Sequence, residues 1–252
     1  MMARTILQIE YDGTAYAGYQ LQPDHLTIQG EIEKALLNLY KEAIRVHASG
    51  RTDAGVHAIY QIVHFTPPRT LKNLNLKAAL NTLLPKDIRV IQTAKGNDDF
   101  HARFSARERQ YRYVISTRNT ALDRDRVWQI YQNLDFDSMK NSADIFIGEH
   151  DFTSFCSAQA EVDHKRCIID RSYWEKDGNH MIYHIHGNRF LHSMVRSLVG
   201  SMVEVGKGRL SIDDLKNILE SEDRSSGAVT APPQGLTLMH VRYEDKINWE
   251  GN

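Results

Sequence analysis

Apolar and polar residues alternate along several short stretches of the chain, which is the pattern of half-buried β-strands. In the N-terminal part, this alternation predicts strands over residues 5–11, 43–48, 59–65 and 87–93. Two further stretches, residues 27–39 and 71–84, carry apolar residues at helical spacing, and Pro85 ends the second. The predicted order is β-α-β-β-α-β, the split βαβ or ferredoxin-like pattern.

A similar order returns in the C-terminal part. The pattern predicts strands over residues 109–116, 166–174, 180–186 and 236–243, and helices over residues 137–147, 191–200 and 212–219. Asp177, Gly178 and Asn179 are typical of a hairpin turn between the second and third of these strands. We therefore expect an α+β protein with two related domains, residues 1–100 and 101–252, whose sheets leave a groove suited to RNA.

Composition indicates an ordinary globular protein. Of 252 residues, 41% are apolar and 25% are charged, and no apolar run is long enough for a membrane span. The N-terminal residues lead directly into a predicted strand, which leaves no room for a secretory signal. Cys156 and Cys167 fit no zinc spacing. We expect a soluble, cytoplasmic protein with reduced thiols.

Charge is unevenly distributed, although the net charge is only −1. Residues 101–126 contain seven arginines and three carboxylates, a local excess of +4. Residues 211–252 contain eight carboxylates and four basic residues, a local excess of −4. The basic stretch predicts a local face for phosphate groups.

The candidate chemistry lies in residues 49–57, a loop of small and charged residues between two predicted strands. Gly50 and Gly55 allow a positive φ or a close backbone approach on either side of Asp53. Arg51 lies two residues away and can keep the carboxylate ionised. An Asp between glycines is more often a turn residue that bonds its own backbone, so spacing alone makes Asp53 a candidate only.

Residues 50–58 read Gly-Arg-Thr-Asp-Ala-Gly-Val-His-Ala, which resembles the signature of the tRNA pseudouridine synthase A (TruA) family. The resemblance implies that Asp53 is the catalytic nucleophile. It also implies that Arg51 enters the RNA beside the flipped uridine. The implied fold is the pseudouridine synthase fold, two ferredoxin-like halves with mostly antiparallel sheets around a central RNA-binding cleft.

Several other segments resemble the same family. Tyr11 to Thr14 and Gly18 to Gln20 match its opening loop, with Tyr19 where the family often has Trp, and residues 231–236 match the segment before its last strand. Residues 100–113 match the segment that carries the active-site tyrosine, which implies that Tyr111 stacks on the uracil. Residues 187–196 match its late helix, which implies that Arg196 pairs with Asp53. Without the resemblance, Tyr111 and Tyr113 at period two are more often a packed strand face.

The family modifies the anticodon arm of tRNA at positions 38, 39 and 40 as a homodimer, so these are the implied substrate and assembly. The isomerisation changes no redox state and transfers no group to another molecule, so we expect no cofactor and no metal. His184 and His186 share a strand face, but they have no third ligand at suitable spacing. The sequence leaves open whether Asp53 attacks the sugar, attacks the base or removes a ribose proton.

Two alternatives remain at this stage. Two ferredoxin-like halves with exposed aromatic residues are also typical of a non-catalytic protein with tandem RNA-recognition modules, although a carboxylate beside the RNA has no use in such a binder. The chain could also be a paralogous synthase that acts on another RNA. A hydrolase with an Asp nucleophile would need a second carboxylate as acid, and residues 49–57 offer none.

Overall fold

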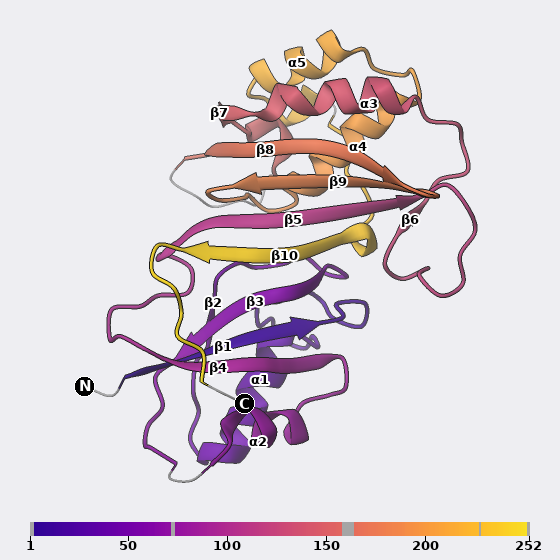
Figure 1. Cartoon of the computed structure of the whole chain (residues 1–252). Coiled ribbons are helices and arrows are strands. Elements are labelled where there is room, and N and C mark those ends of the chain that lie inside the picture. Colours follow the sequence, from indigo (N-terminus) through magenta and orange to yellow (C-terminus); the bar gives the residue numbers. More distant parts are fainter. Residues whose placement is uncertain (1–2, 72–73, 158–163, 227, 251–252) are drawn as a thin grey trace. The chain divides into compact units, whose positions relative to one another are not determined.

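The computed structural model describes residues 3–71, 74–157, 164–226 and 228–250 (Figure 1). The chain forms two compact units: unit 1 is Met1–Arg107 with Leu238–Asn252, and unit 2 is Glu108–Thr237. Both units are α+β with mostly antiparallel strand pairs, as predicted. The predicted domain ranges, 1–100 and 101–252, stay a prediction.

Unit 1 has the predicted β-α-β-β-α-β order. Its elements are β1 (Arg4–Tyr11), α1 (Ile28–Tyr40), β2 (His47–Ala48), β3 (His57–Phe65), α2 (Leu76–Leu83) and β4 (Ile88–Gly96). β1 pairs antiparallel with both β3 and β4, and β2 pairs with β3. The last strand of the chain, β10 (Leu236–Tyr243), also lies beside β3, and its residues from Leu238 onward belong to this unit.

Local chemistry explains where the helices of unit 1 begin and end. The Thr27 side chain accepts a hydrogen bond from the Gly30 N–H and so caps α1 where the sequence predicts a helix start. α2 begins later than predicted because the Asn75 side chain accepts from the Ala78 N–H and caps the helix there. Leu84 has extended backbone, as the residue before a proline usually does.

The strand predicted over residues 43–48 is mostly wrong. Only His47–Ala48 pairs with β3. The Val46 N–H instead donates to the Glu33 Oε1 of α1 at 3.1 Å. Pairing with β3 therefore begins only at His47, the residue after Val46.

Unit 2 contains the remaining elements. They are β5 (Ala106–Ser116), β6 (Trp128–Gln129), α3 (Phe136–Ala143), β7 (Gly148–Asp151), β8 (Arg166–Asp177), β9 (His180–Gly187), α4 (Met194–Gly206) and α5 (Ile212–Glu220). Short 3₁₀ helices cover Asp144–Phe146, Thr153–Phe155, Arg224–Ser226 and Pro233–Gly235. Figure 1 shows α3, α4 and α5 gathered on one side of β8 and β9.

The two units repeat one pairing scheme. β5 pairs with β9 and β9 with β8, just as β1 pairs with β3 and β3 with β2. The predicted hairpin is confirmed, with β8 ending at Asp177 and β9 beginning at His180. Phe152 and Phe155 are fully buried, and His150 and Asp151 lie in strand β7.

Within the described ranges, every helix is too short or too polar to cross a bilayer.

Candidate active site

The backbone of the loop between β2 and β3, residues 49–57, is held from two directions within unit 1. The Ser49 N–H donates to the Ile62 carbonyl of β3 at 2.8 Å. The Tyr19 N–H donates to the Thr52 carbonyl at 3.0 Å, and the Gly55 N–H donates to the Tyr16 carbonyl at 3.3 Å. The loop is therefore fixed by the sheet on one side and by the segment after β1 on the other.

A buried polar network lies under the same loop. The Tyr11 hydroxyl and the Thr52 Oγ1 are 2.8 Å apart, and the Gln61 Nε2 donates to the Gly50 carbonyl at 2.9 Å. The Ser49 hydroxyl donates to the Gln61 Oε1. All of these side chains are buried, and burial raises the pKa of the Tyr11 phenol to about 12. Tyr11 is therefore a neutral hydrogen-bonding group at physiological pH.

Glycines allow the loop and the segment after β1 to come together. Gly55 has φ +77°, which confirms the need for glycine there. Gly18 has φ +99°, and a Cβ on it would lie 2.9 Å from the Thr52 carbonyl oxygen. A Cβ on Gly13 would lie 2.1 Å from the Val56 oxygen. The sequence offered Gly18 only as part of a family match.

Asp53 and Arg51 share this loop. The Asp53 side chain is half-buried, and Arg51 is exposed. The Asp53 carbonyl accepts from the Val56 N–H at 3.2 Å, which closes a backbone turn over residues 53–56. The arrangement presents an acidic and a basic side chain from one rigid loop.

Tyr111 lies on β5 of unit 2 opposite Ile185 of β9. Its ring is largely buried and meets Phe190 edge to face, with ring centroids 5.2 Å apart. Tyr113, two residues along, is fully buried, and its hydroxyl donates to the Pro232 carbonyl at 2.7 Å. Tyr113 is therefore a packing residue.

Arg196 lies on α4 and is bonded to the segment that leads into β10. The Arg196 Nε donates to the Ala231 carbonyl at 2.8 Å, and the Ala231 N–H donates to the Arg196 carbonyl at 3.0 Å. Gly235 follows in the same segment, and a Cβ there would lie 2.6 Å from the Tyr113 ring. The segment from Ala231 to Gly235 thus orients the Arg196 side chain.

The predicted site residues are divided between the units: Asp53 and Arg51 belong to unit 1, whereas Tyr111 and Arg196 belong to unit 2. The ion pair between Asp53 and Arg196 stays a prediction, as does the stacking of Tyr111 on a uracil. In the part of the chain that the structure describes, no three His, Cys, Asp or Glu side chains are grouped to hold a metal ion.

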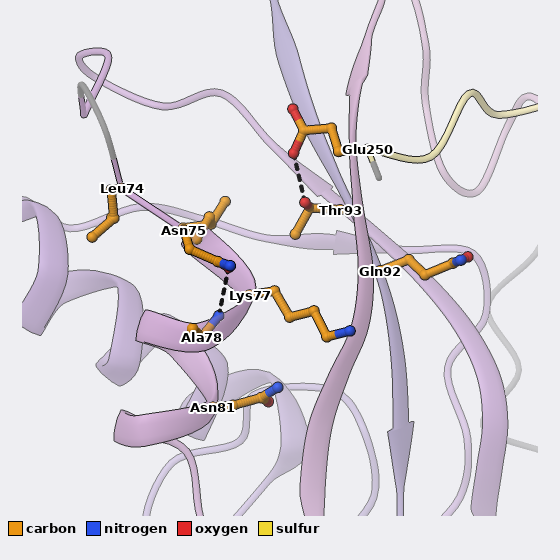
Figure 2. A pocket seen from close by; sticks show the side chains of 9 residues that line it. Leu74, Asn75, Lys77, Ala78, Asn81, Gln92, Thr93 and Glu250 are labelled. Carbon is orange, nitrogen blue, oxygen red and sulfur yellow. Dashed lines mark hydrogen bonds between the residues drawn. The ribbon is translucent and has the colours of Figure 1, made fainter. Parts of the chain in front are cut away.

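A hollow of about 500 Å³ in unit 1 lies beside α2 and β4 (Figure 2). Several of its polar side chains already bond to the protein. Asn81 donates to the Val90 carbonyl and accepts from the Val90 N–H, and Thr93 donates to Glu250 at 2.6 Å. These bonds tie α2 and the C-terminal segment to β4, so the hollow is structural.

A family model described as tRNA pseudouridine synthase matches residues 8–105 and 143–244. This chain belongs to the tRNA pseudouridine synthase family. The matched ranges include Arg51, Asp53 and Arg196 and leave out Tyr111.

Named relatives match over almost the full length. The chain is 43% identical over 247 residues to tRNA pseudouridine synthase A of Anoxybacillus flavithermus, which covers 97% of this chain and 100% of that one. It is 44% identical over 239 residues to tRNA pseudouridine synthase A of Halalkalibacterium halodurans, which covers 93% and 90%. A chain from the "Crystal Structure of a Cbf5-Nop10-Gar1 Complex" aligns with a TM-score of 0.36 at 11% identity, over 95% of this chain and 60% of that one.

Proposed function

We propose that this protein isomerises uridine to pseudouridine in tRNA. The observation that carries the proposal is the membership of the chain in the tRNA pseudouridine synthase family over nearly its whole length. The Asp53 loop supports it, since a buried network and two directions of backbone bonding hold a carboxylate at a fixed place. A fixed carboxylate can meet a reacting atom without reorganisation.

We assign the central chemical role to Asp53. The reaction breaks the bond between the sugar C1′ and the base N1, turns the uracil and joins C1′ to the base C5. Attack on the sugar, attack on the base and removal of a ribose proton all require the ionised carboxylate.

Three further residues have supporting roles in this proposal. Arg196 pairs with Asp53 and holds the carboxylate in place, because a guanidinium matches the geometry of a carboxylate. Tyr111 stacks on the uracil, and Arg51 fills the gap that the flipped nucleotide leaves in the RNA. Flipping a base costs a few kcal/mol and costs least where stacking is weak.

The finer substrate and assembly belong to the same proposal. We infer that the target uridines are positions 38, 39 and 40 of the anticodon arm, and that a homodimer in the cytoplasm binds the tRNA. The basic stretch of residues 101–126 supplies side chains for the RNA backbone.

Carbodiimide treatment and reverse transcription of total RNA, from cells with and without this protein, test the proposal. We expect stops at positions 38 to 40 of tRNAs only when the protein is present. Stops confined to ribosomal RNA would instead indicate a synthase for another RNA. RNA binding without any new stop would indicate a non-catalytic binder.

A further inference from the structure

Three histidines, two arginines and one exposed phenylalanine gather at the end of β3 that lies away from the Asp53 loop. We call this group the histidine patch; it consists of Arg4, Arg45, His47, His64, His101 and Phe104. All six residues belong to unit 1. His64 lies seven residues along β3 from His57, where the loop ends, which is roughly 23 Å at the rise of an extended strand. The patch is therefore far from the end of the loop at His57, while its His47 lies two residues before the start of the loop at Ser49.

The rings of the patch form one continuous aromatic cluster. His47 stacks on His64 with centroids 5.1 Å apart, and His101 lies 4.7 Å from His64 and 5.4 Å from His47. The Phe104 ring lies 4.4 Å from the His101 ring at an interplanar angle of 35°. Phe104 is 75% exposed, so one end of this row of rings faces solvent.

Backbone bonds fix the tautomers of two of the histidines. The His64 Nδ1 accepts from the Ala102 N–H at 3.1 Å. The His101 Nδ1 accepts from the Arg103 and Phe104 N–H groups at 3.2 and 3.3 Å. In the neutral form of His101, Nε2 therefore carries the proton and can donate to a ligand, whereas the Nε2 of the buried His64 lies 3.4 Å from the Arg4 guanidinium.

A hollow of about 470 Å³ opens between the arginines and the histidines. It is lined by Arg4, Ala43, Ile44, Arg45, His47, His64, Thr66, Pro68 and His101, a set with cationic and donor side chains and no carboxylate. The Arg4 guanidinium is held by a hydrogen bond to the Phe100 carbonyl. Arg45 has Glu33 at 3.5 Å, and its side chain is still 58% exposed. This lining suits a phosphate group.

We propose that the histidine patch is a second RNA-binding surface, in which Arg4, Arg45 and His47 contact backbone phosphate and Phe104 stacks on an unpaired base. Cationic side chains that follow the backbone, together with aromatic faces for the bases, are the usual means of binding single-stranded RNA. The inference rests on the proposed function, because the RNA is the tRNA substrate. It places these contacts outside the nucleotide that reacts at Asp53.

The test uses the full-length protein and a tRNA transcript, with dissociation constants measured between 50 and 300 mM salt. We expect Arg45→Ala to weaken binding and to make the salt slope shallower by about one unit. Phe104→Ala should raise Kd about 5-fold or more without changing the slope, whereas Phe104→Tyr should bind as the unchanged protein does. The control is Arg209→Ala, since Arg209 is 60% exposed and also paired with one glutamate.

Unchanged Kd and salt slope in both Arg45→Ala and Phe104→Ala would overturn the proposal, as would an equal loss in Arg209→Ala. Pseudouridine formation by the unchanged protein is measured in parallel. If that activity is absent while the two variants still lose binding, the proposed function fails and the RNA surface stands. If the activity is present and neither change affects binding, only the proposed role of the histidine patch in RNA binding is contradicted.

Discussion

The Tyr11 hydroxyl lies 2.8 Å from the Thr52 hydroxyl, and Thr52 is the residue directly before Asp53. Tyr11 ends β1, so this bond ties the Asp53 loop to the sheet of unit 1. Gln61 of β3 adds a second tie through the Gly50 carbonyl. The position of the proposed nucleophile therefore depends on buried polar side chains that never need to touch the RNA.

Tyr11→Phe removes this hydroxyl and leaves the ring. We expect the free energy of unfolding to fall by about 1 kcal/mol. We also expect kcat on tRNA to fall while Kd is nearly unchanged, because the loop loses one of its ties. Tyr183→Phe is the matched control, since the Tyr183 hydroxyl is also buried and lies 2.7 Å from the Ser172 hydroxyl in unit 2. Equal kcat in the two variants would contradict a positioning role for Tyr11.

Gly18→Ala places a methyl group 2.9 Å from the Thr52 carbonyl oxygen at a φ of +99°. We expect a loss of about 2–3 kcal/mol in unfolding free energy, together with lower kcat, because the loop must shift to make room. Gly178→Ala is the control, since Gly178 has φ +56° and open space around its Cβ position. Denaturant unfolding measures the unfolding free energy of both variants. If Gly18→Ala loses no more of it than Gly178→Ala does, the close approach of Gly18 to the Thr52 carbonyl is unimportant.

The sequence could predict the elements but not the contacts that decide their limits. The helix start at Thr27 and the hairpin at Gly178 follow from local chemistry that adjacent residues carry. The late start of the predicted strand, at His47, depends on Glu33, which lies 13 residues from Val46 in the chain. No window of neighbouring residues contains that bond.

The candidate site shows the same division. The glycines and charges around Asp53 are visible in the sequence, and Gly55 adopts the positive φ that the pattern predicts. Tyr111 and Tyr113 share one face at period two, so the pattern could not separate them. The hydroxyl bond from Tyr113 to the Pro232 carbonyl, 119 residues away, identifies Tyr113 as a packing residue.

His64 makes stability depend on pH. Burial, followed by the charges of His101, His47 and Arg4, lowers the pKa of His64 from 6.5 to about 3. Between these values the unfolded chain binds more protons than the folded one, so the free energy of unfolding falls as pH drops below 6.5. We expect His64 to account for a loss of about 1–2 kcal/mol between pH 7 and pH 5.

Urea unfolding of His64→Asn at both pH values measures this effect. Asparagine keeps an acceptor for the Ala102 N–H but does not titrate. Between pH 7 and pH 5, the free energy of unfolding should therefore fall less in the variant than in the unchanged protein, and the difference is the contribution of His64. The pKa of His101 is also lowered, and that contribution is common to both proteins. Equal losses would show that His64 does not resist protonation in the fold.

Arg196→Met removes the guanidinium that we propose to pair with Asp53. We expect kcat on tRNA to fall while Kd is nearly unchanged, because the carboxylate loses the cation that we propose holds it in place. Tyr113→Phe is the control, since it loosens the same segment at Pro232 and keeps the guanidinium. Equal losses of kcat in both variants would assign Arg196 a structural role only.

Asp53→Asn tests the central claim most directly, because it keeps the shape of the side chain and removes its charge. The measurement is tritium release from tRNA labelled at C5 of uridine, together with the Kd for the same tRNA. We expect release at background and a Kd within about 3-fold of the unchanged protein, since the amide fills the same space and the rest of the RNA-binding surface is unaltered. Tritium release above background by Asp53→Asn would show that the nucleophile lies elsewhere.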